Sequence, residues 1–276
     1  MKFNIKKIVQ TFLPLLLGGF LVGYLFTIIP PATLLDYFKN ANYGWVTLGL
    51  FFGILSHLSR AYRWKFMLAP MGYKPKFSNS FLAVLIGYFV NLALPRAGEV
   101  SRATVMVNYE NIPFEKGFGT IVAERIADLI MMFAIVGITL FFQFDFIVAL
   151  VLKNFDPLKI GMLIATAIGG IIIFILFVKK ATKGFLLTIK NFVLSLIEGI
   201  LSILKMKKKW AFLFHTVFIW VMYVAMFWAT IPAIEGLDVP VGGILVGFIA
   251  GGFSIAATNG GIGLYPVAVA GAFQLF

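Results

Sequence analysis

Six ionisable residues stand inside or next to apolar stretches of the sequence, where charge is uncommon. Three are arginines and three are carboxylic acids: Arg96, Glu99, Arg102, Glu124, Arg125 and Asp128. Charges at membrane depth are costly, and by default they mark a site or pair with one another. The planar guanidinium of arginine can donate two parallel hydrogen bonds to a phosphate. The set therefore predicts a phosphate site, a structural network of ion pairs, or both together.

The spacing of these residues suits two helices. On a helix, Glu99 and Arg102 (i, i+3) share a face, and so do Glu124 and Asp128 (i, i+4). Arg125 points about 100° away from Glu124, because a helix has about 3.6 residues per turn. Ion pairs would lock the two helices together, and the carboxylates would hold the arginines in place while the site is empty.

Two breaks interrupt apolar segments of the chain. At the first, Asn91 stands one turn before Pro95, where it either contacts a ligand or caps the backbone groups that Pro95 frees. At the second, three glycines within four residues deny the backbone a regular helix. They let a headgroup approach bare backbone amides, or they only permit a tight turn. The candidate residues at the breaks are Asn91, Pro95, Gly98, Asn259, Gly260, Gly261 and Gly263.

A second basic cluster closes the apolar stretch 44–62. His57, Arg60 and Trp64 recur at i, i+3 and i+7 and so share a helix face, with Arg63 beside them. Basic and aromatic residues at the cytoplasmic end of a span usually anchor it at the membrane surface. The cluster is therefore predicted to be an interface anchor, with contact to a lipid headgroup as the alternative.

Composition identifies the class of protein that must position these residues. Of the 276 residues, 61% are hydrophobic and 12% charged, whereas a soluble domain has about 45–50% apolar and about 25% charged residues. A water-soluble enzyme is therefore excluded. Cysteine is absent and the two histidines, His57 and His215, lie far apart, so neither a metal site nor another cofactor is expected.

The distribution of basic and acidic residues among the loops predicts how the chain is oriented in the membrane. Five stretches are apolar enough and long enough to span a bilayer, residues 8–29, 44–62, 121–143, 158–178 and 210–232. The loops 30–43, 144–157 and 233–239 hold two basic and five acidic residues, while the other loops hold the excess of lysine and arginine. The N-terminus is therefore predicted to be cytoplasmic, and the net charge of +12 reflects the membrane rather than a nucleic-acid partner.

Residues 77–120 must then leave the cytoplasm and return to it. They contain one apolar run, 81–94, and a shorter charged segment, 99–107, which together fit a re-entrant helical hairpin. Residues 241–276 repeat this arrangement from the outer face, or form an ordinary span with a glycine kink. Two interrupted segments that enter from opposite faces are typical of inverted-repeat transporters.

The predicted fold is an all-α polytopic membrane protein with five transmembrane helices and two re-entrant hairpins in inverted orientation. A narrow polar stripe along residues 184–205 predicts one amphipathic helix at the cytoplasmic interface. We expect a single transmembrane domain over residues 1–276, no soluble domain, and a natural chain that continues past Phe276.

Four strings, in this order and spacing, resemble the membrane region of bacterial lysylphosphatidylglycerol synthases and their stand-alone, flippase-like relatives. They are Arg60-Ala-Tyr-Arg63-Trp64, residues 91–103, Glu124-Arg125-Ile-Ala-Asp128 and Asn259-Gly260-Gly261-Ile-Gly263. The resemblance implies movement of aminoacylated or other polar lipids between the leaflets of a bacterial inner membrane. The aminoacyl-transferase domain of that family is absent, so the chain is not expected to be an enzyme.

Three functions are compatible with these observations. The first is a lipid translocase, a flippase- or scramblase-like carrier of a phospholipid or other polar lipid. The second is a membrane-embedded enzyme that uses Glu99, Glu124 or Asp128 as acid or base, although an arginine partner would keep each carboxylate ionised. The third is an assembly subunit without transport of its own. The oligomeric state stays open.

Overall fold

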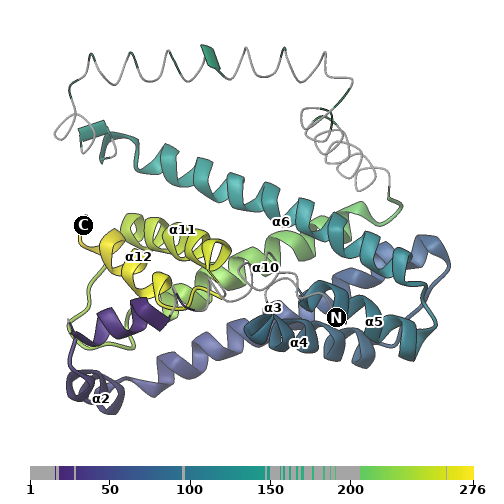
Figure 1. The fold of residues 1–276 in the computed structure, drawn as a ribbon, viewed down its shortest axis with the longest axis horizontal. Helices are drawn as coiled ribbons and strands as arrows, with labels where there is room; N and C mark the ends of the chain where they lie inside the picture. Colours follow the sequence, from purple (N-terminus) through teal and green to yellow (C-terminus); the bar gives the residue numbers. More distant parts are fainter. Residues whose placement is uncertain are drawn as a thin grey trace, which may run out of the picture. The chain divides into compact units, whose positions relative to one another are not determined.

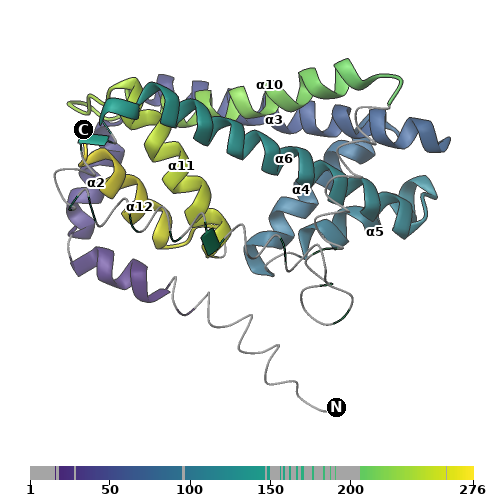
Figure 2. The ribbon, with the colours of Figure 1, turned by 90° about the horizontal axis from the view of Figure 1, so that it is seen from above.

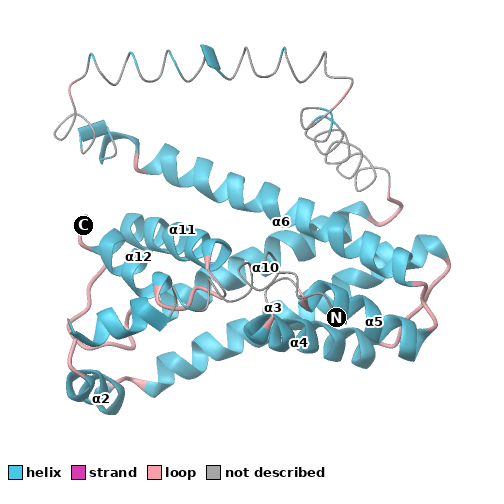
Figure 3. Ribbon diagram, viewed as in Figure 1, coloured by secondary structure: helices cyan, strands magenta, loops and turns pink. Residues whose placement is uncertain are grey.

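The computed structural model describes residues 16, 19–27, 29–94, 97–146, 148–149, 206–258 and 260–276, with scattered positions between 156 and 190. Within these residues it contains helices and loops and no strand (Figures 1 and 3). The chain divides into two compact units, of which Gly137–Lys207 is one, and Met1–Val136 with Lys208–Phe276 is the other. The helices are α2 (Pro31–Asn40), α3 (Tyr43–Leu68), the short 3-10 helix η1 (Ala69–Met71), α4 (Phe77–Ala93), α5 (Gly98–Glu110), α6 (Phe114–Phe142), α10 (Lys209–Ala229), α11 (Val241–Ala257) and α12 (Leu264–Phe273).

Helices α3 and α10 pack along one another as an antiparallel pair (Figure 2). Near the start of α3, a Cβ built on Gly49 would lie 3.7 Å from Ala229 Cβ. Near its end, Arg63 Nη1 donates to Thr216 Oγ1 at 2.8 Å. Gly49 and Gly53 are buried, so the absence of side chains lets the backbones approach closely, as small residues do between membrane helices.

Helices α4 and α5 form an antiparallel hairpin, here called hairpin 1. At its open end, Glu110 at the end of α5 accepts hydrogen bonds from Lys76 N and Asn79 Nδ2 at the start of α4. At its tip, Asn91 Oδ1 accepts one from Gly98 N at 2.8 Å. The helical hairpin predicted for residues 77–120 is therefore present.

Helices α11 and α12 form a second antiparallel hairpin, hairpin 2. Aromatic side chains of the returning arm fill the grooves that glycines leave on α11. A Cβ built on Gly247 would lie 2.5 Å from Phe273 Cε1, and one on Gly251 would lie 2.6 Å from Tyr265 Cε2. The turn uses positive φ at Gly260 (64°), Gly261 (82°) and Gly263 (74°), a conformation that glycine adopts without strain. The chain folds back here, and the alternative of one kinked span is wrong.

The two hairpins start at opposite ends of the α3–α10 pair. Hairpin 1 follows the end of α3, and hairpin 2 follows the end of α10. Because these two helices are antiparallel, the hairpins point toward each other. Their tips come close, since a Cβ built on Gly260 would lie 4.0 Å from Leu92 Cδ2.

Two of the predicted spans correspond to helices long enough and apolar enough to cross a membrane, α6 and α10, among the described residues. The predicted span 44–62 lies within α3, a continuous helix of 26 residues whose polar second half lowers its mean hydropathy. The span 158–178 and the amphipathic helix 184–205 lie outside the described residues, apart from isolated positions, and so does half of span 8–29. The number of five spans therefore stays a prediction.

Candidate functional site

Seven charged side chains from three helices meet in one place. We call them the charge network: Arg60 and Arg63 from α3, Glu99 and Arg102 from α5, and Glu124, Arg125 and Asp128 from α6. All of them lie within one compact unit. Side chains 22 to 68 positions apart in the sequence are thereby brought into direct contact between helices.

Asp128 holds the two arginines of α3. Arg60 Nη1 donates to Asp128 Oδ2 at 2.9 Å, and Arg63 Nη2 donates to Asp128 Oδ1 at 3.3 Å. Arg60 Nη2 also donates to the hydroxyl of Tyr223 on α10, at 3.2 Å. Both arginines are buried, and buried charge is tolerated only when it is paired and hydrogen-bonded in this way.

Glu124 holds the arginine of hairpin 1. Arg102 Nη1 and Nη2 donate to Glu124 Oε2 and Oε1 at 2.5 and 3.3 Å, a two-pronged arrangement that fixes orientation as well as charge. The Arg102 guanidinium also lies 3.8 Å from the ring centroid of Trp64. Trp64 is fixed in turn, because its indole N–H donates to Thr120 Oγ1 at 2.7 Å.

Arg125 and Glu99 form the outermost pair of the charge network. Arg125 Nη2 lies 2.9 Å from Glu99 Oε1, and the two side chains are 48% and 22% exposed. Arg125 Nη1 is 3.8 Å from Asp128 Oδ2, so this pair adjoins the buried pairs. The other oxygen of the carboxylate, Glu99 Oε2, has no hydrogen-bond partner among the described residues.

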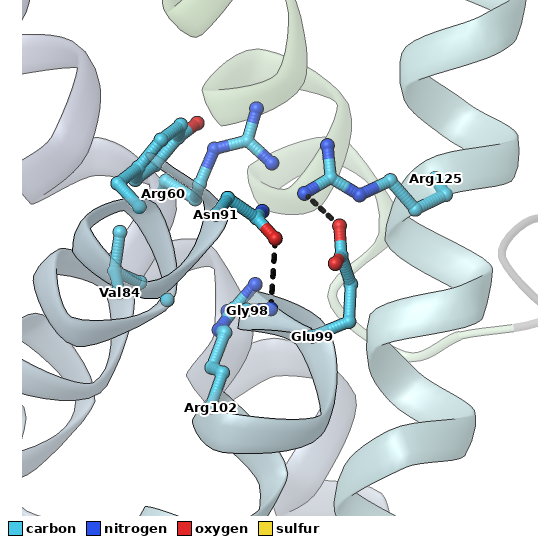
Figure 4. A pocket seen from close by; sticks show the side chains of 9 residues that line it. Arg60, Val84, Asn91, Gly98, Glu99, Arg102 and Arg125 are labelled. Carbon is cyan, nitrogen blue, oxygen red and sulfur yellow. Dashed lines mark hydrogen bonds and ion pairs between the residues drawn. The ribbon is translucent and has the colours of Figure 1, made fainter. Parts of the chain in front are cut away.

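A small pocket opens against the charge network at the tip of hairpin 1 (Figure 4). Three of the four arginines line it, and the Nε–H groups of Arg60 and Arg102 have no hydrogen-bond partner among the described residues. Tyr88 hydroxyl lies 3.1 Å from Tyr223 hydroxyl beside it. The lining residues are Arg60, Val84, Gly87, Tyr88, Asn91, Gly98, Glu99, Arg102 and Arg125.

The pocket has the chemistry of an anion site. Its arginines are held by Glu99, Glu124 and Asp128, and the pocket lies beside the first turn of α5, where Gly98 and Glu99 line it. An anion placed there would meet guanidinium groups and the positive end of a helix dipole. The carboxylates Glu99, Glu124 and Asp128 each face at least one arginine, which suits them to hold charge rather than to exchange protons.

The predicted site residues fall into three groups in the structure. Those of hairpin 1 and α6 lie together, and their role in binding a substrate stays a prediction: Asn91, Gly98, Glu99, Arg102, Glu124, Arg125 and Asp128. Asn91 lines the pocket and also accepts a hydrogen bond from Gly98 N at the start of α5; whether it caps the backbone groups that Pro95 frees stays a prediction. Gly260, Gly261 and Gly263 instead form the turn of hairpin 2. Pro95, Arg96 and Asn259 lie outside the described residues.

The prediction that Arg60, Arg63 and Trp64 form an interface anchor is wrong. Trp64 and Arg63 are 0% exposed and Arg60 is 3% exposed, because α5, α6 and α10 cover this end of α3. His57 lies against the ring of Tyr88, with ring centroids 4.6 Å apart. Basic residues that anchor a helix at the membrane surface and basic residues on a buried helix face have the same spacing in the sequence. Here Arg60 and Arg63 can be buried because they pair with Asp128 of α6.

Four residues that contact the charge network, the pocket or Trp64 were not predicted from the sequence: Tyr88, Thr120, Thr216 and Tyr223. Each is a lone hydroxyl in an apolar helix, so no pattern distinguishes it from its neighbours. A tyrosine or threonine inside an apolar stretch would have been the only signal, since a buried hydroxyl needs a hydrogen-bond partner.

The comparisons with known proteins agree with this picture. The family model described as "Lysylphosphatidylglycerol synthase TM region" matches residues 11–276, so the chain belongs to this family of membrane proteins. The resemblance noted from the four strings is thereby confirmed.

Two curated relatives, both archaeal, share parts of the sequence. "UPF0104 membrane protein MJ1595" of Methanocaldococcus jannaschii is 32% identical over 151 residues, which is 54% of this chain and 43% of that protein. "Glycosyltransferase AglD" of Haloferax volcanii is 29% identical over 113 residues, 41% of this chain and 18% of that protein. The chain thus matches less than half the length of each relative. No solved structure matches it.

Proposed function

We propose that this member of the lysylphosphatidylglycerol synthase TM region family is a carrier that moves a phosphate-bearing polar lipid between the two leaflets of a membrane. The substrate is the lipid headgroup, and the protein acts without aminoacyl-transfer chemistry of its own. We further propose that the N-terminus is cytoplasmic and that the membrane is a bacterial inner membrane.

One observation carries the proposal, the pocket at the tip of hairpin 1. Arg60, Arg102 and Arg125 line it, and the Nε–H groups of Arg60 and Arg102 have no hydrogen-bond partner among the described residues. A phosphate that leaves water needs such donors to replace its lost hydration. A network that is only structural is expected to satisfy its buried donors within the protein.

The two hairpins support a carrier over a static binding protein. They start at opposite ends of the α3–α10 pair, and their tips meet at Leu92 and Gly260. Inverted elements with interrupted helices are typical of transporters that expose one site to each side in turn. We propose that both hairpins enter the membrane from opposite faces.

The test is reconstitution into vesicles that contain headgroup-labelled phosphatidylglycerol, phosphatidylcholine or a neutral glycolipid without phosphate. We expect the protein to speed the transbilayer movement of the phospholipids relative to the glycolipid. Arg125→Gln should slow this movement several-fold, because it removes one phosphate donor. A matched control is Lys116→Gln, which removes an exposed cation from the same helix and should leave the rate unchanged.

Two results would contradict the proposal. One is the absence of any headgroup-dependent movement in vesicles that contain correctly folded protein. The other is an equal loss of movement in Arg125→Gln and Lys116→Gln, which would mean that general surface charge, and not the pocket, sets the rate.

A further inference from the structure

The charge network contains one pair that differs from all the others in its surroundings. Arg60, Arg63 and Arg102 are almost fully buried, and their partners Glu124 and Asp128 are 1% and 10% exposed. Arg125 is 48% exposed and pairs with Glu99, which is 22% exposed. An exposed ion pair contributes less to stability than a buried one, and a ligand can reach it from outside the protein.

The bonding of Glu99 is also incomplete. Of its two carboxylate oxygens, Oε1 faces Arg125 Nη2 and Oε2 has no partner among the described residues. The buried carboxylates differ, because Glu124 and Asp128 each use both oxygens. Glu99 is thus the carboxylate that can leave its arginine at the smallest cost, and it stands in the lining of the pocket (Figure 4).

We infer that Glu99 is a built-in competitor of the ligand, which occupies Arg125 in the empty site and is displaced from it by the ligand phosphate. This inference rests on the proposed function. Glu99 and a phosphate both present anionic oxygens to the same guanidinium, so Arg125 cannot serve both fully. The buried pairs stay intact during the exchange and keep Arg60 and Arg102 directed into the pocket.

This competition has a function in a carrier. A site of three arginines without a competitor would bind a phosphate tightly and release it slowly. Glu99 weakens binding and returns to Arg125 as the ligand leaves, which favours release. Removing its charge should strengthen ground-state binding without speeding the cycle, because uniform binding lowers KM and does not raise kcat.

The experiment compares four versions of the full-length protein in detergent and in vesicles. Short-chain phosphatidylglycerol is titrated into the wild type, Glu99→Gln, Arg125→Gln and the double variant. We expect Glu99→Gln to bind about two- to fivefold more tightly, the change that a partly exposed ion pair is worth. In vesicles its KM should fall by a similar factor, while kcat does not rise. Glu115→Gln, which neutralises an exposed carboxylate of α6, should change neither value.

The double variant separates competition from a structural effect. If Glu99 acts by occupying Arg125, Glu99→Gln should have no effect on affinity once Arg125 is already glutamine. Unchanged or weaker binding by Glu99→Gln, or a tightening that persists in the Arg125→Gln background, would overturn the inference and leave the proposed function standing. A wild-type protein that neither binds nor moves phosphatidylglycerol would overturn the proposed function and this inference with it.

Discussion

At the scale of single residues, four arginines share three carboxylates, and the position of each arginine relative to the pocket decides what it contributes. Arg63 and Arg102 are held on several sides and mainly fix the helices, whereas Arg60, Arg102 and Arg125 present donors to the pocket. Arg102 belongs to both groups. It is therefore the residue at which a structural role and a binding role can be separated experimentally.

Arg102→Gln should lower both folded yield and lipid movement. It leaves Glu124 buried with only the longer 3.9 Å contact to Arg63 Nε, and breaking a buried pair from one side costs about 3–5 kcal/mol. Arg102→Gln combined with Glu124→Gln removes both charges, so the yield should largely recover. Transport per folded molecule should not recover, because the pocket has lost a phosphate donor. Tm and vesicle flux measure the two effects.

The purely structural interpretation makes the opposite prediction for the double variant. If the pair only locks α5 to α6, flux should return together with Tm. Near wild-type flux in the double variant would remove Arg102 from the phosphate site and leave it as a structural residue.

The sequence predicted the carboxylates of the site better than its arginines. Glu124 and Asp128 recur at i, i+4 next to an apolar run, which is a pattern contained in the local sequence. The burial of Arg60 and Arg63 depends on α6 and α10 packing against α3. These contacts join residues 65 to 163 positions apart. No local spacing contains that information, so a surface anchor and a buried donor look the same.

At the scale of helices, close approach of backbones decides how the hairpins fold. In hairpin 1, Gly98 at the start of α5 meets Gly87 of α4. A Cβ at Gly98 would overlap the Gly87 carbonyl oxygen and lie 2.7 Å from Asn91 Cγ. The position must therefore be glycine for the tip to close and for Asn91 to reach Gly98 N.

Gly98→Ala should open the tip of hairpin 1 and destabilise the protein by at least about 1–3 kcal/mol, the usual range for overpacking. The obstacle is backbone, which cannot move aside as a flexible side chain can. Gly119→Ala in α6 is a matched control, because a Cβ there meets nothing within 4 Å. Thermal unfolding in detergent measures both variants, and equal Tm values would show that the tip does not need this contact.

Both hairpins could be located in the sequence, because breaks such as Pro95 to Gly98 and Gly260 to Gly263 are local signals. The sequence did not show in which direction the chain continues after each break. For hairpin 2 a kinked span and a hairpin both fitted the sequence, and the packing of Phe273 and Tyr265 into the glycines of α11 decides in favour of the hairpin. That packing requires α12 to lie against α11, and the residue pattern of either helix alone does not predict this contact.

At the scale of the whole molecule, the basic loops predict how the chain is oriented in the membrane. Because α3 and α10 are antiparallel, the same orientation predicts the side from which each hairpin enters. The open end of hairpin 1 lies where α3 ends, and that of hairpin 2 lies where α10 ends. If the N-terminus is cytoplasmic, the first opens to the cytoplasm and the second to the outside.

Single cysteines can test this orientation, since the native chain has none. We expect Asn108→Cys and Lys116→Cys to react with a membrane-impermeant thiol reagent only from the cytoplasmic side. Glu235→Cys, in the loop before hairpin 2, should react only from the outside. All three native side chains are exposed, so accessibility within the protein is not limiting. Reaction of both Asn108→Cys and Lys116→Cys from outside would contradict the re-entrant arrangement of hairpin 1.

The excess of arginine over carboxylate in the charge network has a consequence for energetics across the membrane. Its described side chains carry one net positive charge, and a phosphodiester with one negative charge would neutralise it. Moving one elementary charge across a membrane potential of 100 mV changes its energy by about 2.3 kcal/mol. The potential would therefore act on the empty carrier, whose site is positive, and not on the loaded carrier, whose site is neutral. On the proposed function, voltage would then change the rate at which the unloaded site returns, while the step that carries lipid would be insensitive to it.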